Sequence, residues 1–153
     1  MARTSSDIVI DAPPRAIMDV IADFATYPDW ATGVKSADVV AGTGSADEGG
    51  ARAEQVHFVL DAAPIRDEYD LAYTWNGDSS VSWRLAEKGA MLTAMDGAYE
   101  LAPIDGSSTR VTYQLSVDVS VPLLGMLKRK AEKVIIDTAL KGLKKQVEAR
   151  EAS

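Results

Sequence analysis

The 153-residue chain contains no cysteine and a single histidine, His57. Without cysteine there is no disulfide framework, no thiolate nucleophile and no cysteine-based metal site. One histidine cannot by itself build a histidine-rich metal site. The sequence also lacks the G-x-S-x-G, H-E-x-x-H and dinucleotide G-x-G-x-x-G motifs. We therefore expect no metal and no cofactor, and we assign no residue a catalytic role.

Long apolar runs are missing as well. No stretch approaches the ~20 apolar residues that cross a bilayer, and the first residues, MARTSSDIVIDAPP, have no apolar core long enough for a signal peptide. A cytoplasmic protein is the expectation. With 46% hydrophobic and 25% charged residues, the chain is typical of one globular domain over residues 1–153 with a sizeable core.

Positive charge is scarce except at the end of the chain. Residues 128–151 carry eight Lys or Arg and four Asp or Glu, a net charge of +4. Because the whole chain has a net charge of −7, the other residues together carry −11. The overall acidity argues against a nucleic-acid partner, because phosphate binding needs a positive surface. The basic end fits either a solvated helix face or weak peripheral contact with an anionic membrane.

The end of the chain has the strongest periodic pattern. Pro122 suits the first turn of a helix, and apolar or small residues then recur at helical spacing from Leu123 to Glu148. A helix of that length would extend roughly 39 Å at ~1.5 Å per residue. It needs a broad apolar surface to lie on. Gly142, which is unfavourable inside a helix, indicates close approach to a strand.

The rest of the chain predicts that surface. A strand at 3–11 precedes a helix that starts at Asp11–Pro14 and ends near Phe24, with a turn or second short helix at 27–30. Alternating residues then predict strands at 34–40, 52–60, 65–75, 81–86, 91–101 and 109–121. Turns such as Asn76-Gly77-Asp78 and Asp105-Gly106 favour antiparallel pairing. The fold class is therefore α+β.

Several short motifs in this order resemble one family. They are Ile10-Asp11-Ala12-Pro13, Asp23-Phe24, Tyr27-Pro28-Asp29-Trp30, Ser82-Trp83-Arg84-Leu85, 97–103, 109–113 and the terminal 121–144 stretch. The set resembles the START-like superfamily (SRPBCC, or Bet v 1-like), in particular its actinobacterial polyketide cyclase/dehydrase and coenzyme-Q-binding-protein-like groups. The resemblance implies a helix-grip fold: a curved antiparallel sheet of about six to seven strands around a long C-terminal helix, with one or two short helices after the first strand.

The inward faces of the strands and the apolar stripe of the helix offer a set of candidate ligand-cavity residues: Phe58, Tyr69, Tyr73, Trp83, Met95, Tyr99, Tyr113, Leu127, Val134, Ile135 and Thr138. Tyrosine and tryptophan combine a large apolar body with one polar atom, as an apolar pocket requires. On the residues alone, a filled core is the simpler interpretation, and the resemblance favours a cavity. Trp30 is interpreted as packing between the short helices and the sheet.

Charged residues on the strands have two interpretations each. If Val56 and Phe58 face inward, His57 faces solvent, and the opposite register would turn it inward. Asp67 is either solvated at the sheet end or an acid or base at a cavity mouth. The arginines of the strands, Arg66, Arg84 and Arg110, suit cross-strand ladders with Glu68, Asp70 or Glu100.

These observations favour binding or carriage of a hydrophobic small molecule, such as a lipid, quinone or polyketide-like compound. The alternative is a polyketide cyclase or aromatase in which tyrosine hydroxyls orient the substrate. A third interpretation is contact with partners or membranes through the basic helix face. The oligomeric state stays open between monomer and homodimer.

Overall fold

The computed structural model describes residues 4–31, 33–42, 53–62, 65–87, 92–120 and 125–152. In chain order the elements are β1 (Thr4–Ile10), α1 (Pro14–Ala22), the 3-10 turn η1 (Phe24–Thr26), α2 (Tyr27–Trp30), β2 (Val34–Gly42), β3 (Ala53–Ala62), β4 (Ile65–Asn76), β5 (Ser80–Glu87), β6 (Leu92–Pro103), β7 (Thr109–Val119) and α3 (Gly125–Ala152). The 42–50 loop beyond Gly42, and Pro122 with the expected helix start at Leu123, lie outside the described residues.

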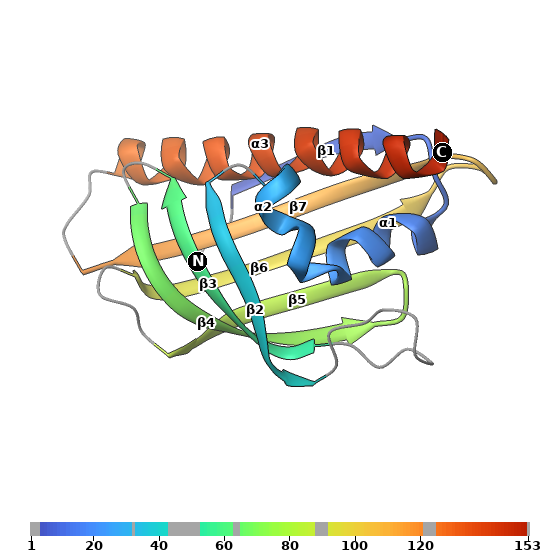
Figure 1. The fold of residues 1–153 in the computed structure, drawn as a ribbon. Helices are drawn as coiled ribbons and strands as arrows, with labels where there is room; N and C mark the ends of the chain where they lie inside the picture. The colour runs from blue at the N-terminus through green and yellow to red at the C-terminus, as the bar shows by residue number, and fades with distance from the viewer. Residues whose placement is uncertain are drawn as a thin grey trace.

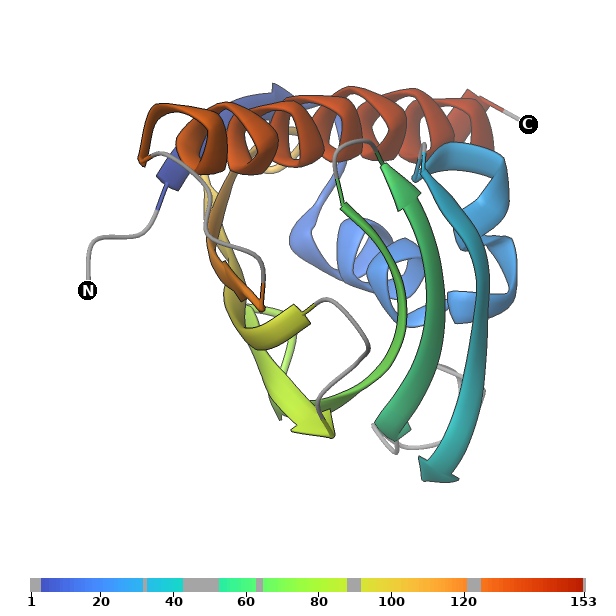
Figure 2. The same ribbon diagram turned by 90° about the vertical axis from the view of Figure 1, so that its left-hand side faces the viewer.

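All seven strands form one antiparallel sheet in the order β1-β7-β6-β5-β4-β3-β2. Sequential strands from β2 to β7 are neighbours, and β1 lies at the edge beside β7, where for example Ile8 pairs with Val111. The sheet curves, and α3 crosses its open side while α1 and α2 lie beside it (Figures 1 and 2). This is the α+β helix-grip arrangement that the sequence predicts.

Strand alternation decides which side chains enter the core. On β3, Val56, Phe58 and Leu60 are buried, whereas His57 between them lies on the opposite, outer face. On β7, Val111, Tyr113, Leu115 and Val117 are likewise buried. Because successive strand residues point to opposite faces, the aromatic and aliphatic residues of neighbouring strands collect on the concave side. Of the two registers that the sequence leaves open for β3, the structure has the one in which His57 faces outward.

A buried carboxylate fastens α3 to the sheet. Glu132, only 2% exposed, accepts a hydrogen bond from the backbone N–H of Val117 (2.8 Å) and another from the hydroxyl of Thr4 (2.5 Å). The described pairing of β1 with β7 ends at Thr4 and Leu115, so the N–H of Val117 lies beyond that ladder. A buried N–H group requires a hydrogen-bond acceptor. Glu132 supplies that acceptor in place of a further residue of β1.

Farther along the chain, α3 packs against α2. The closest point is Gly142, where a Cβ atom would lie 1.8 Å from the carbonyl oxygen of Trp30. The sequence predicts a strand at this contact, and that expectation is wrong: the partner is the backbone of the short helix α2. The glycine is needed because no other residue type leaves room for that carbonyl group.

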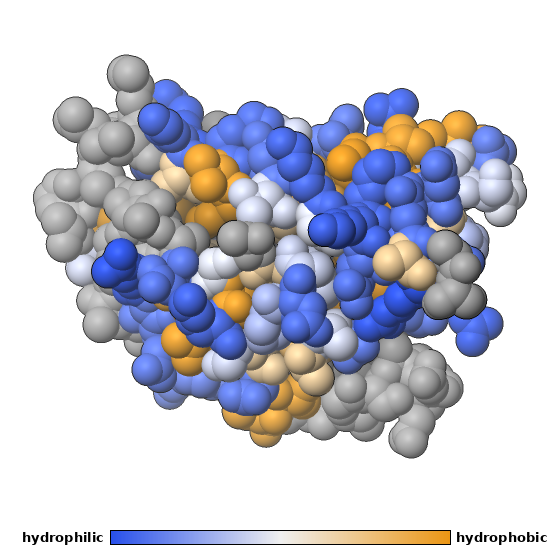
Figure 3. Space-filling view, turned by 45° about the horizontal axis from the view of Figure 1, so that its top comes forward, coloured by the Kyte–Doolittle hydropathy of each residue, from blue (hydrophilic) through white to orange (hydrophobic). Residues whose placement is uncertain are grey.

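The solvent side of α3 is charged, and several of its cations are paired. Lys128 contacts Asp118 (2.9 Å), Lys133 contacts Asp137 (2.8 Å), Lys144 contacts Glu148 (2.5 Å) and Arg150 contacts Asp23 (2.8 Å). Figure 3 shows this upper face of the molecule as mostly hydrophilic with scattered apolar patches. Among the described residues, no helix is long and apolar enough to cross a membrane.

Replacing Gly142 with alanine tests the contact between α2 and α3. In an exposed helix this change would stabilise by about 1 kcal/mol. Here the added methyl group meets backbone atoms, so we expect a net loss of about 1–3 kcal/mol in the free energy of unfolding. Denaturant titration measures it, with exposed Lys141→Ala as the control on the same turn. An unchanged or higher stability of Gly142→Ala would contradict the close approach.

Candidate functional site

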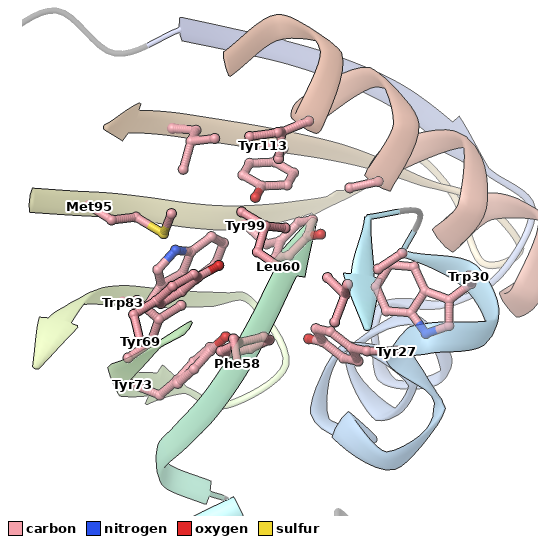
Figure 4. A pocket seen from close by; sticks show the side chains of 16 residues that line it. Tyr27, Trp30, Phe58, Leu60, Tyr69, Tyr73, Trp83, Met95, Tyr99 and Tyr113 are labelled. Atoms are coloured by element: carbon pink, nitrogen blue, oxygen red, sulfur yellow. The ribbon is translucent and has the colours of Figure 1, made fainter. Parts of the chain in front are cut away.

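A cavity of about 70 Å³ lies between the concave face of the sheet, α2 and α3. Six strands and two helices contribute to it, and its wall consists of Tyr27, Trp30, Ala31, Val34, Phe58, Leu60, Tyr69, Leu71, Tyr73, Trp83, Met95, Tyr99, Tyr113, Leu115, Ile135 and Ala139. Figure 4 shows the labelled aromatic side chains around this space, with Met95 at one side and Trp30 at the other. The wall contains no Asp, Glu, Lys, Arg or His side chain among the described residues.

Aromatic rings form a continuous set of contacts around the cavity. Phe58 stacks on Tyr69 with centroids 5.8 Å apart, and Tyr73 lies 5.7 Å from Trp83. Trp83 in turn lies 5.4 Å from Tyr99 and 5.6 Å from Tyr113. Such ring pairs contribute about 0.5–1.5 kcal/mol each beyond the area they bury. The wall is therefore held in shape by the sheet register, which places these residues on one face.

A glycine on β6 sets the position of the Trp83 indole. Gly97 is the cross-strand partner of Trp83, and a Cβ atom at Gly97 would lie 2.3 Å from two indole carbons. The indole therefore occupies the space that a side chain at Gly97 would need. A glycine in a strand often marks such a close approach.

All five tyrosines of the chain line the cavity. Tyr27 donates its hydroxyl to the carbonyl oxygen of Ile21. Within the described residues, the hydroxyls of the other four form no hydrogen bond with protein atoms. Burial raises the pKa of every one of these hydroxyls well above its usual value. The cavity therefore offers neutral hydroxyl groups that can donate or accept a hydrogen bond, and no phenolate base.

The indole Nε1 of Trp30 is completely enclosed and has no hydrogen-bond partner among the described residues, whereas the unpaired tyrosine hydroxyls border the cavity. Trp30 is 5% exposed and lies beside Tyr27, with ring centroids 4.7 Å apart. The sequence indicates only a packing role for Trp30. Tyr27 and Trp30 are three residues apart on one short helix, and that spacing was the available signal that both face the same space.

The structure places eight of the eleven predicted cavity residues in this wall: Phe58, Tyr69, Tyr73, Trp83, Met95, Tyr99, Tyr113 and Ile135. Val134 requires a correction, because it is 50% exposed on the outer side of α3. Successive residues of an α-helix point in directions about 100° apart. Val134 therefore faces outward although its neighbour Ile135 lines the cavity. Thr138 is half-buried and Ala139 lies in the wall instead. The side chain of Leu127 lies outside the described residues.

Asp67 does not face the cavity as an acid or base. It is 9% exposed, and its two carboxylate oxygens accept hydrogen bonds from the backbone N–H groups of Glu68 (2.8 Å) and Leu92 (2.7 Å). Asp67 thus ties the start of β4 to the start of β6. The expectation of a solvated residue at the sheet end is also wrong, because both oxygens are used in a buried contact.

Two of the three strand arginines, Arg66 and Arg110, form ion pairs on the outer face, with partners other than those expected, and Arg84 forms none with the described residues. Arg66 contacts Asp61, its cross-strand neighbour, at 2.8 Å, and Arg110 contacts Asp7 at 3.7 Å. Glu100 instead accepts a hydrogen bond from Gln114 at 3.1 Å. Exposed pairs of this kind contribute about 0–1 kcal/mol, so they say little about the site.

His57 lies on the outer face between two carboxylates of β4. Its Nδ1 is 2.6 Å from Asp70 and its Nε2 is 3.2 Å from Glu68. The hydrogen bond to Asp70, followed by that to Glu68, raises the pKa of His57, and the same bond to His57 lowers the pKa of Asp70. Both ring nitrogens donate only when the imidazole is protonated. His57 is therefore a surface ion-pair residue, remote from the cavity.

The fold and its enclosed aromatic cavity define a helix-grip protein. The chain belongs to the family described as "Polyketide cyclase / dehydrase and lipid transport", whose family model matches residues 1–148. Similar solved structures include a START superfamily protein from Mycobacterium smegmatis, 20% identical, with TM-score 0.85 over 97% of this chain and 99% of that one. At these identities, the structural likeness shows the shared fold alone.

Two further solved structures have the same fold. The Zhui aromatase/cyclase from Streptomyces sp. R1128 is 14% identical, with TM-score 0.75 over 97% of this chain and 94% of that one. A protein from Thermus thermophilus is 22% identical, with TM-score 0.75 over 97% and 98% of the two chains. A comparison with curated proteins finds no match.

The pKa of His57 predicts a pH-dependent contribution to stability. A pKa raised by folding stabilises the protein below the unfolded value of 6.5, and the contribution is lost as pH rises through the folded value. The lowered pKa of Asp70 has the opposite pH dependence. Its contribution to stability is present above pH 3.8 and is lost as pH falls below that value. We expect the melting temperature of the wild type to exceed that of His57→Gln by the largest amount between pH 3.8 and pH 6.5. Thermal unfolding over a pH series measures it, and a constant difference up to about pH 8.5 would contradict the ion pairs.

The raised tyrosine pKa values predict unusual alkaline behaviour. Because the unfolded chain ionises near the ordinary value of 10.0 and the folded chain does not, stability should fall as pH rises through that value. Absorbance at the tyrosinate band should stay flat until the protein unfolds, and then rise for all five tyrosines together. Gradual titration of several tyrosines while circular dichroism stays native would show that the hydroxyls are hydrated rather than buried.

Proposed function

We propose that this protein binds and carries a hydrophobic small molecule in the cavity under α3. The observation that supports this most is the composition of the wall: apolar and aromatic side chains, with tyrosine hydroxyls as its main polar groups. Ligand sites are typically apolar with a few orienting polar groups. A wall without ionisable groups near neutrality suits binding and orientation better than acid–base chemistry.

The hydroxyls narrow the chemistry of the ligand. Tyr69, Tyr73, Tyr99 and Tyr113 come from three strands of the sheet and border one space. A neutral hydroxyl that lacks a protein partner gains a hydrogen bond when a ligand oxygen approaches, and its desolvation is then compensated. The ligand we propose is therefore largely apolar and carries carbonyl or hydroxyl oxygens, as lipids, quinones and polyketide-like compounds do.

The size of the cavity constrains how a ligand fits. A volume of about 70 Å³ is well below the ~300–1,000 Å³ of pockets that hold drug-sized molecules. A ligand of ordinary size must therefore displace side chains or extend beyond this space. Met95 is suited to such movement, since methionine is unbranched and adapts its shape.

A polyketide cyclase or aromatase is the second candidate. It is supported by the same group of four tyrosines, because hydroxyls fixed around one space could hold the carbonyl groups of a folded chain in a reactive geometry. Comparing polyketide products of the host with and without the gene separates the two candidates. Identical products, together with retained ligand binding by the purified protein, would favour carriage.

Ile135→Trp tests whether the cavity is the binding site. The larger side chain should fill most of the space, so affinity for 1-anilinonaphthalene-8-sulfonate (ANS), a fluorescent probe of apolar pockets, should fall about tenfold or more. The change should cost about 1–3 kcal/mol in stability, and unfolding curves measure this separately. Native mass spectrometry of gently purified protein provides the parallel test for a retained natural ligand.

Val134→Trp is the matched control, since Val134 is the neighbouring residue but lies half exposed on the outer side of α3. It should bind ANS as wild type does. If Ile135→Trp and Val134→Trp bound the probe equally well, the cavity would not be the ligand site. Failure of wild type to bind ANS or to retain any ligand would remove the support for carriage altogether.

A further inference from the structure

The sheet divides between β5 and β6. Their backbone pairing runs from Ser80 with Glu100 to Arg84 with Asp96 and stops there, although both strands continue. Beyond that point β5 stays paired with β4, as far as Glu87, and β6 stays paired with β7, as far as Leu92. Figures 1 and 2 show the end of β5 and the start of β6 lying apart.

A hollow of about 350 Å³ occupies this division, and we call it the slot. It is lined by Arg84, Leu85, Ala86, Thr93, Ala94, Met95 and Asp96. Arg84, Ala86 and Asp96 are exposed, whereas Met95 is buried on the concave face. Two hydrogen-bonded strands lie only about 4.8 Å apart and leave no such space. Because side chains of both faces border it, the slot passes between the strands.

Met95 belongs to the wall of the slot and to the wall of the aromatic cavity. Met95 is therefore the residue that the two walls share. We propose that the slot is a side opening of the cavity, plugged by Met95, and that a ligand longer than the cavity passes Met95 and leaves its end in the slot. The inference about the occupant rests on the proposed function, whereas the opening itself does not.

The slot differs in chemistry from the cavity, and this defines the class of ligand. Arg84 and Asp96 border it, and neither forms an ion pair in the part of the chain that the structure describes. The backbone groups of Leu85 and Ala86 that would face β6 also have no strand partner there. Apolar rings inside and polar groups outside suit an elongated amphiphile, whose apolar part fills the cavity and whose polar end stays in the slot.

A single engineered thiol measures the opening without any ligand. The chain has no cysteine, so in Met95→Cys the only thiol is at the plug. We expect 5,5′-dithiobis(2-nitrobenzoate) to modify it much faster than the protein unfolds globally, because local opening exposes it. Adding Ala86→Trp, which fills the slot from its outer side, should slow the reaction about fivefold or more, and the smaller Ala86→Leu should slow it less.

Ser82→Trp is the matched control, because Ser82 is exposed on the same strand, where β5 is still paired with β6 through Ala98. It should change the rate by less than about twofold. Equal modification rates in the Ala86→Trp and Ser82→Trp backgrounds would overturn the side opening. Modification of the engineered thiol only as fast as global unfolding would overturn it as well.

Saturating ANS tests the occupant. A probe that passes the plug should protect the engineered thiol of Met95→Cys from modification, and Ala86→Trp should weaken ANS binding about fivefold relative to Ser82→Trp. Full ANS binding without protection of this thiol would overturn the extension of the ligand into the slot. If wild type bound no ANS while the two tryptophan variants still differed in labelling rate, the proposed function would fail and the opening would stand.

Discussion

The closure of the curved sheet by α3 is the contact on which the rest of the structure depends. A sheet with this many aromatic residues on its concave face cannot leave that face in water, and α3 is the one described element long enough to cover it. Two contacts hold the helix at the sheet and at α2. Glu132 completes the backbone hydrogen bonding of β7, and Gly142 lets the backbone of α2 approach. Together they hold the helix across the sheet without filling the space beneath it.

That space remains open because its wall is built from rigid rings. Tyr69, Tyr73, Tyr99 and Tyr113 stand on three strands and contact Trp83 or Phe58. Aromatic side chains have few rotamers and pack at fixed separations, so they do not collapse as aliphatic chains would. Their hydroxyls are buried and neutral, which gives the cavity hydrogen-bonding capacity without charge.

Ionisable groups are kept elsewhere. His57, Asp70 and Glu68 pair on the convex face, Asp67 ties two strand ends together, and Glu132 holds the helix. Each is satisfied by partners outside the cavity wall. The polar side-chain groups of the cavity wall are therefore the tyrosine hydroxyls and the indole N–H of Trp30 among the described residues. This division is the physical basis of the proposal that the cavity binds an oxygen-bearing apolar molecule.

Much of the fold could be predicted from the sequence, because it depends on local rules. Alternation of polar and apolar residues predicted the strands, although it left open which face His57 occupies, and helical spacing predicted the long terminal helix. The same rules placed eight of the candidate residues in the cavity wall. The family resemblance, carried by ordered short motifs, supplied the expectation that a cavity lies there.

Contacts between distant segments were decided only by the tertiary structure. Helical periodicity in the sequence locates the inward face of a helix only to within about one residue. It therefore assigned both Val134 and Ile135 to the wall, although Val134 is exposed and only Ile135 lines the cavity. The close partner of Gly142 is a backbone carbonyl of α2, which no pattern near position 142 encodes. The parting of β5 from β6 beyond Arg84 depends on each strand keeping its other neighbour. Sequence spacing specifies which face a residue occupies, but only packing specifies what lies opposite it.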